Sequence, residues 1–158
     1  MLDSLVLKLD IEFPEVQFVK SSTFKWDPDE LKIYYSSKSK NSVWSLLHEV
    51  GHMVLKHKNY RSDFSLLKME AQAWHKAREL APTHKIKIDP EHIEKCLDSY
   101  RDWLYARSSC RECMQTGLEI STGLYKCINC HFRWKVTPER FCRVYRKKIE
   151  PSNMQALL

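Results

Sequence analysis

The chain has 158 residues, the length of one ordinary domain with room for a small accessory module. Hydrophobic residues make up 43% of it, which predicts a folded core, while a mean hydropathy of -0.51 and the lack of an apolar run of about 18 residues argue against a membrane-spanning helix. The net charge of +6 comes from the C-terminal third, because residues 106–158 hold 10 Lys and Arg against 4 Asp and Glu.

The first residues and the cysteines bear on the compartment. Residues 1–13 alternate apolar and charged side chains, and Asp3 stands where a signal peptide would carry positive charge. Six cysteines without an export signal are more often reduced thiols or metal ligands than disulfides. We therefore expect a cytoplasmic protein without a membrane partner.

Short β-strands are predicted within residues 11–35. Apolar and polar residues alternate at 15–18 and again at 31–35, the pattern of half-buried strands. Asp27-Pro28-Asp29 between these segments has the composition of a turn. We expect a small hairpin or meander here.

Three helices are predicted after this sheet, each from apolar residues at helical spacing and a capping signal. They cover residues 43–54, after the polar segment 39–42; residues 62–81, from a cap at Ser62 and Asp63 to the stop at Pro82; and residues 90–107, after Asp89. Beyond residue 107 the sequence becomes basic and strand-like, with strands expected at 124–126 and 132–136.

The strongest chemical signal is His48-Glu49-Val50-Gly51-His52 in the first predicted helix. Residues four apart on an α-helix differ by about 40° in azimuth, so His48 and His52 project together and can bind one Zn²⁺. Glu49 then lies beside the metal, where a carboxylate can take a proton from water. Gly51 lets another part of the chain approach this helix closely. The alternative interpretation is an ordinary exposed face of an amphipathic helix.

A catalytic zinc site needs a third protein ligand. Glu70 is the best candidate, because it lies in the apolar stripe of the second predicted helix and Glu is rarely buried unless it is paired or bound to metal. The alternative is a buried Glu paired with Lys or Arg. His57 lies nine residues after His48, about 180° around a continued helix, and is expected to face away.

The segments 46–57 and 69–74 resemble the ImmA/IrrE group of bacterial metallopeptidases and, more broadly, the small gluzincins. The resemblance covers residues 11–80 and does not include the cysteine-rich end. It implies a short β-sheet whose edge pairs with an extended substrate, followed by two helices that carry the site. Carried over to this sequence, it implies His48, His52 and Glu70 as zinc ligands and Glu49 as the catalytic base.

A second metal site is predicted from two Cys-x-x-Cys pairs, Cys110 with Cys113 and Cys127 with Cys130. Each pair forms a turn that directs two thiolates at one point, and two turns give a tetrahedral site with no open position. The spacing is typical of a zinc ribbon with a structural zinc ion. Disulfides and a redox or iron site are the alternatives.

Basic residues surround this ribbon and alternate with aromatic ones, among them Phe132, Trp134, Phe141 and Tyr145. Such alternation suits phosphate contacts combined with base stacking, and hence a nucleic acid partner. The alternatives are a protein partner or a solvated face on a small module whose aromatic residues form its core.

These observations predict an α+β protein: a minimal zincin-like domain at residues 1–107, with a small sheet and three helices, a β zinc ribbon at 108–146 and a polar tail at 147–158. We expect a zinc-dependent endopeptidase with one catalytic and one structural Zn²⁺, acting on a peptide or protein substrate. Two alternatives stay open: a DNA-associated protease resembling the SprT group, for which no segment supplies the third His, and a non-enzymatic module in which a fourth ligand closes the first site.

Overall fold

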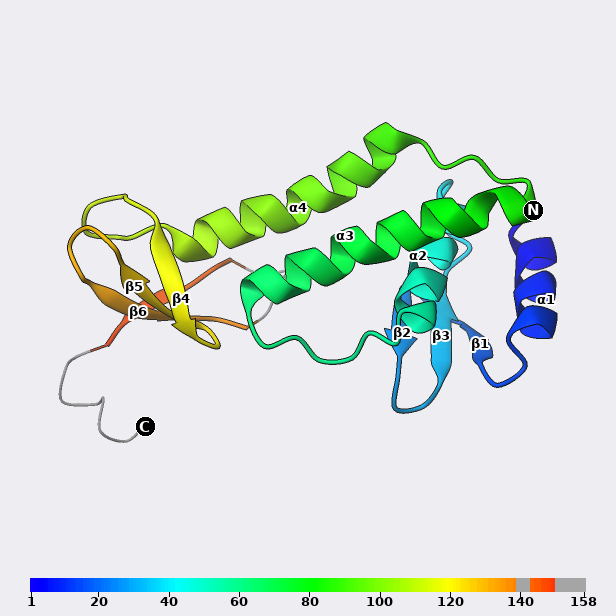
Figure 1. The fold of residues 1–158 in the computed structure, drawn as a ribbon, viewed down its shortest axis with the longest axis horizontal. Coiled ribbons are helices and arrows are strands. Elements are labelled where there is room, and N and C mark those ends of the chain that lie inside the picture. Colours follow the sequence, from blue (N-terminus) through cyan, green and yellow to red (C-terminus); the bar gives the residue numbers. More distant parts are fainter. Residues whose placement is uncertain (139–142, 150–158) are drawn as a thin grey trace. The chain divides into compact units, whose positions relative to one another are not determined.

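The computed structural model of the chain describes residues 1–138 and 143–149. In this part of the chain four α-helices and two β-sheets are present, which confirms the expected α+β class (Figure 1). The chain folds into two compact units. The first comprises Met1–Asn59 and Lys68–Glu94, and the second comprises Tyr60–Leu67 and the described residues from Lys95 onward. The second unit thus holds the start of one helix and most of another, besides the ribbon predicted at 108–146.

The sheet of the first unit has three strands, β1 (Gln17–Lys20), β2 (Lys25–Asp27) and β3 (Lys32–Tyr35), in the order β1-β3-β2. Strands β2 and β3 form the predicted hairpin around the turn that begins at Asp27. Strand β1 pairs with β3 in parallel, so the sheet is not a simple meander. Both β1 and β2 are edge strands, and Ile33 of the central strand is fully buried.

A helix that the sequence did not predict, α1 (Leu2–Glu12), precedes the sheet. Leu5 and Leu9 are buried one turn apart, whereas Leu7 is 66% exposed. Leu5, Leu7 and Leu9 are spaced two residues apart, as in a strand, but the two buried leucines are four residues apart, about one helical turn. The contacts that α1 makes with α2 and β1 decide which leucines belong to the core.

The three predicted helices are present as α2 (Ser42–Val54), α3 (Asp63–Leu80) and α4 (Pro90–Ser108), with a 3₁₀ turn, η1 (Ala81–His84), after α3. Two caps form as expected, because the Ser62 hydroxyl accepts a hydrogen bond from the backbone N–H of Ser65 and the Asp89 carboxylate accepts one from that of Glu91. Helix α2 packs against β2 and β3 of the first unit (Figure 1).

The second unit contains an antiparallel sheet of four strands in sequential order, β4 (Gly117–Ser121), β5 (Leu124–Cys127), β6 (Arg133–Val136) and β7 (Arg146–Lys148). Its core is formed by buried side chains from both cysteine turns and from β5 and β6, namely Cys110, Cys127, Tyr125, Trp134 and Val136. Residues 147 and 148, assigned to a polar tail by the sequence, belong to β7, and residues 150–158 lie outside the described residues.

Asp63 has a different role from the expected helix cap. Its buried carboxylate forms an ion pair with Arg107 of α4 and accepts a hydrogen bond from the Tyr125 hydroxyl of β5. Arg107 also donates to the carbonyl of Thr137, and its own carbonyl accepts the indole N–H of Trp134. These bonds join the start of α3, the end of α4 and the ribbon sheet within the second unit.

Candidate metal centres

The first candidate centre lies in the first unit, between α2 and α3. His48 and His52, one turn apart on α2, are both buried, and their Nε2 atoms are 3.2 Å from each other. The carboxylate of Glu70 on α3 reaches both rings, with Oε2 at 3.1 Å from His48 Nε2 and Oε1 at 3.6 Å from His52 Nε2. Glu70 is thus buried against two histidines rather than against a Lys or Arg, and the exposed-face interpretation of the motif is wrong.

The close approach of α2 and α3 depends on Gly51. A Cβ atom at this position would lie 2.4 Å from the carbonyl oxygen of Ala73, which belongs to α3 one turn beyond Glu70. Only a residue without a side chain lets the two backbones come so near. The sequence prediction that Gly51 permits a close approach is therefore confirmed, and the approaching segment is the one that carries Glu70.

The spacing of the ligand atoms of these three residues is compatible with a zinc ion. Four N or O ligands at about 2.0–2.1 Å from a tetrahedral ion are about 3.3–3.4 Å from one another. Here the two histidine Nε2 atoms are 3.2 Å apart, and one carboxylate oxygen of Glu70 lies 3.1 Å from His48 Nε2 while the other lies 3.6 Å from His52 Nε2. His48, His52 and Glu70 can therefore hold a metal ion, and no fourth His, Cys, Asp or Glu among the described residues joins the group.

Electrostatics keep the third member of the group charged. Burial raises the pKa of Glu70, but hydrogen bonds and charge interactions with His48 and His52 outweigh it, so that this pKa lies well below its ordinary value. The carboxylate therefore stays ionised in its buried position, as a metal ligand must.

Glu49 lies beside this group and is held by the sheet. Its Oε2 accepts a hydrogen bond of 2.8 Å from the backbone N–H of Trp26 in the edge strand β2. Burial raises the pKa of Glu49, and the neighbouring histidines only partly oppose this effect. The side chain is thus a carboxylate of increased basicity next to the candidate metal ligands.

His57 is not a member of the metal group, as the sequence predicted, but the helix does not continue to it and it lies close to the site. Helix α2 ends at Val54, and Lys56 adopts a left-handed conformation with φ 54°, which turns the chain back. The Nδ1 atom of His57 lies 3.0 Å from Nδ1 of His52, on the side of that ring opposite the metal group. The carbonyl of His57 in turn accepts the indole N–H of Trp26.

The rings of His48 and His52 are held in place by different kinds of contact. His52 is oriented by His57, an outer partner of the kind that fixes the ring of a metal-binding His. The buried Nδ1 of His48 has no hydrogen-bond partner among the described residues, and its ring is instead stacked on Trp74 of α3, with centroids 4.3 Å apart. Neither Trp26 nor Trp74 was predicted to support the site, because their contacts join segments far apart in the sequence.

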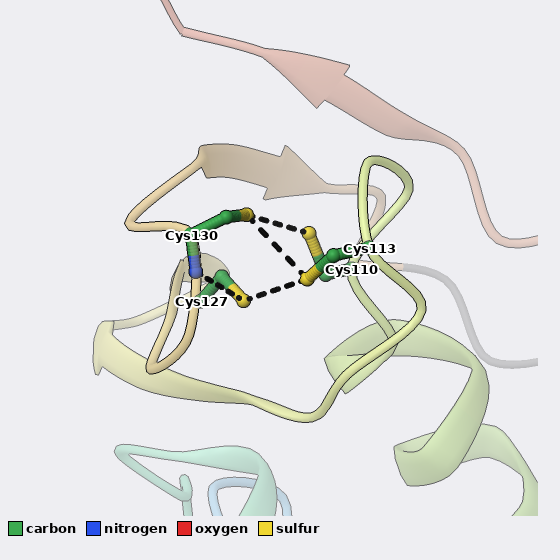
Figure 2. Close-up of side chains that lie close together, drawn as sticks. All are labelled: Cys110, Cys113, Cys127 and Cys130. Carbon is green, nitrogen blue, oxygen red and sulfur yellow. Dashed lines mark hydrogen bonds between the residues drawn. The ribbon is translucent and has the colours of Figure 1, made fainter.

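The second candidate centre is the cysteine cluster of the second unit. Figure 2 shows the four sulfur atoms of Cys110, Cys113, Cys127 and Cys130 converging on one space. Their close separations are 3.5–3.6 Å, near the value of about 3.8 Å for thiolates around a tetrahedral zinc ion and far from the ~2.05 Å of a disulfide. The four cysteines are free of disulfides and can hold a metal ion compatible with zinc.

The two cysteine turns have the same backbone conformation. In each, the N–H of the first cysteine donates to a carbonyl five residues later, Cys110 to Gln115 and Cys127 to Phe132. The residue after the second cysteine, Met114 or His131, has φ 60° in both turns. Two equivalent turns facing each other present their thiols to a common point, as the sequence spacing predicted.

The cysteine thiols influence one another's protonation. The backbone N–H of Gln115 and the side chain of Asn129 lower the pKa of Cys113 to about 6. At Cys130 the backbone N–H of Phe132 acts in the same direction, but desolvation and the three neighbouring sulfurs raise its pKa to about 12. A cation bound at this point would favour the thiolate form of Cys130, whose pKa the neighbouring sulfurs raise.

The aromatic residues of the ribbon belong mainly to its core. Trp134 is fully buried and stacks on Tyr125, and Phe132 packs against the same cluster. Tyr145 is 62% exposed, and Phe141 lies outside the described residues. The burial of Trp134 excludes base stacking by this residue, for which the alternative of an aromatic core is right, while Phe132 is partly buried beside the same core.

Comparisons with known protein families, curated proteins and solved structures find no match for this chain. Among the described residues, no helix combines the length and the apolar character needed to cross a bilayer.

Proposed function

We propose that the chain is a zinc-dependent endopeptidase with a minimal zincin-like domain, and that the cysteine cluster holds a second, structural zinc ion. The observation that carries the proposal is the convergence of His48, His52 and Glu70 next to the carboxylate of Glu49. A structural zinc ion is usually enclosed by four protein ligands, whereas a catalytic one has three and an open position. The first group has three members and the cysteine cluster has four, which supports different roles for the two sites.

The proposed chemistry assigns one task to each residue of the first site. His48, His52 and Glu70 hold the ion, which when bound lowers the pKa of water and polarises a peptide carbonyl. Glu49 takes the proton from the attacking water and transfers it to the amine of the departing peptide. Its raised pKa suits this task, because a more basic carboxylate accepts a proton more readily.

The edge strand β2 is the proposed place for the substrate backbone. Trp26 pairs with Ile33 of β3 on one side, while its N–H is directed to Glu49 on the other. The outer edge of β2 therefore runs past the proposed base, and an extended peptide can add there as a further strand when the Trp26 N–H is released from Glu49.

A cavity of about 470 Å³ lies in the first unit and includes Trp26 and Met53 in its wall. Met53 directly follows His52, and further apolar wall residues are Phe13, Val16, Pro28, Leu31 and Val54. This cavity is a suitable place for an apolar side chain of the substrate close to the bond that is cut.

The test combines two variants with metal analysis. Glu49→Gln removes a base but no ligand, so we expect two zinc ions per chain and loss of hydrolysis of a fluorogenic peptide mixture by a factor of about 10² or more. Glu70→Ala reduces three ligands to two, so we expect loss of one zinc ion and of hydrolysis. Hydrolysis by Glu49→Gln at the wild-type rate would contradict the proposal, as would unchanged zinc content in Glu70→Ala.

A further inference from the structure

The strand register gathers basic side chains on one face of the ribbon sheet. Lys126 of β5 lies directly opposite Arg133 of β6, and Lys135 of β6 lies directly opposite Lys147 of β7. Arg133 and Lys135 are two residues apart in one strand, so both pairs lie on the same face. Leu118 lies opposite Lys126, and Leu124 lies opposite Lys135, so both leucines belong to this face as well. We call these six residues the basic sheet face.

The opposite face of the sheet holds the core of the second unit, and β7 adds Arg146 and the exposed Lys148 to that face. Tyr125 and Trp134 form the core there, and Glu119 accepts hydrogen bonds from the backbone N–H groups of Asp63 and Gly123. Glu119 is the one acidic residue among the described residues of the four strands. The basic sheet face therefore carries four cations and neither a carboxylate nor an aromatic ring.

Two exposed like charges lie directly opposite each other within this face. Like charges directly opposite each other on neighbouring strands destabilise a sheet, and Lys135 and Lys147 form such a pair. Lys135 and Lys147 are exposed, so their ammonium groups are accessible to a polyanion. A line of phosphates would relieve the repulsion within this pair.

We propose that the basic sheet face binds the phosphate backbone of a nucleic acid duplex. Charge complementarity selects a polyanion, and the buried position of Trp134, with Phe132 partly buried against the same core, argues against base stacking as the main source of affinity. Contacts of Lys and Arg with phosphates carry no sequence information by themselves, so the binding is not sequence-specific. The proposal does not depend on peptide hydrolysis at the first site.

The test measures duplex binding of the full-length, zinc-loaded chain as a function of salt, using a 20-base-pair DNA of mixed sequence. Four neutralised phosphates give a slope of log K against log salt of about -3.6, or a loss of affinity of about 150-fold between 50 and 200 mM salt. In the triple variant Lys126→Gln, Lys135→Gln and Lys147→Gln, the slope is expected to become less steep by about 2.7.

A second triple variant supplies the matched control. Lys38→Gln, Lys40→Gln and Lys87→Gln removes the same charge from exposed positions of the first unit and is expected to keep the wild-type slope. Zinc content of two ions per chain in both variants shows that the ribbon is intact, and Lys→Arg at the three ribbon positions is expected to restore binding. Equal effects of the two triple variants would overturn the proposal, and so would undetectable duplex binding at about 50 mM salt. Tighter binding of poly-glutamate than of the duplex would assign the face to an acidic protein partner instead.

Discussion

Replacing Gly51 with alanine tests whether the contact between α2 and α3 positions the first metal site. The added Cβ would lie 2.4 Å from the carbonyl oxygen of Ala73 and 3.2 Å from its carbonyl carbon, whereas ordinary contacts are 3.4–4 Å. These neighbours are backbone atoms, which cannot rotate away. The helices must therefore separate by roughly 1 Å or distort.

The expected size of the effect follows from this displacement. Glu70 is one turn from Ala73 on α3, and functional metal sites tolerate deviations of about 0.2 Å in their ligand distances. Overpacking of this kind costs about 1–3 kcal/mol, which corresponds to metal binding weakened by about 5- to 150-fold if the cost falls on the site. Without a clash, the change from Gly to Ala inside a helix would instead stabilise the protein by about 1 kcal/mol.

The assay is a competition with a chelator that separates the two zinc ions by affinity. Gly51→Ala is expected to release the zinc of the first site at a lower chelator concentration, while the cysteine cluster retains its zinc. Ser45→Ala on the same helix is the control and is expected to behave like the wild type. A stabilised Gly51→Ala protein with unchanged zinc affinity would refute the argument that this contact positions Glu70.

Two further predictions concern the second unit. Cys110→Ser should remove one zinc ion and unfold the ribbon sheet. In the wild-type protein with zinc present, a reducing agent should leave the ribbon sheet intact, and unfolding by mild thiol would indicate disulfides instead. Asp63→Asn leaves the buried guanidinium of Arg107 without its counter-charge, so we expect the free energy of unfolding of this unit to fall by about 3–5 kcal/mol. The measurement is a urea titration followed by the accessibility of the cysteines. A loss below about 1 kcal/mol would show that the ion pair is not needed.

Much of the two candidate sites could be predicted from patterns that extend over only a few residues of sequence. The turn-to-turn spacing of His48 and His52, and the two Cys-x-x-Cys turns, bring ligand atoms together through local backbone geometry alone. Glu70 was identified because a carboxylate within an apolar helical stripe requires a buried partner. The limits of α3 and α4 likewise followed from caps and prolines that act within a few residues, whereas Asn41 before α2 makes no side-chain cap hydrogen bond.

Contacts between distant segments decided the rest. Burial of Leu5 and Leu9 against neighbouring elements made residues 2–12 a helix, although their sequence alternates with a period of two. The reversal after Val54 brought His57 back to His52, and the hairpin β2–β3 brought the N–H of Trp26 to Glu49, neither of which any local period encodes. In the ribbon, the sequence shows basic and aromatic residues in alternation. Only the strand register, which assigns alternate residues to opposite faces, separates the buried rings from the exposed charges.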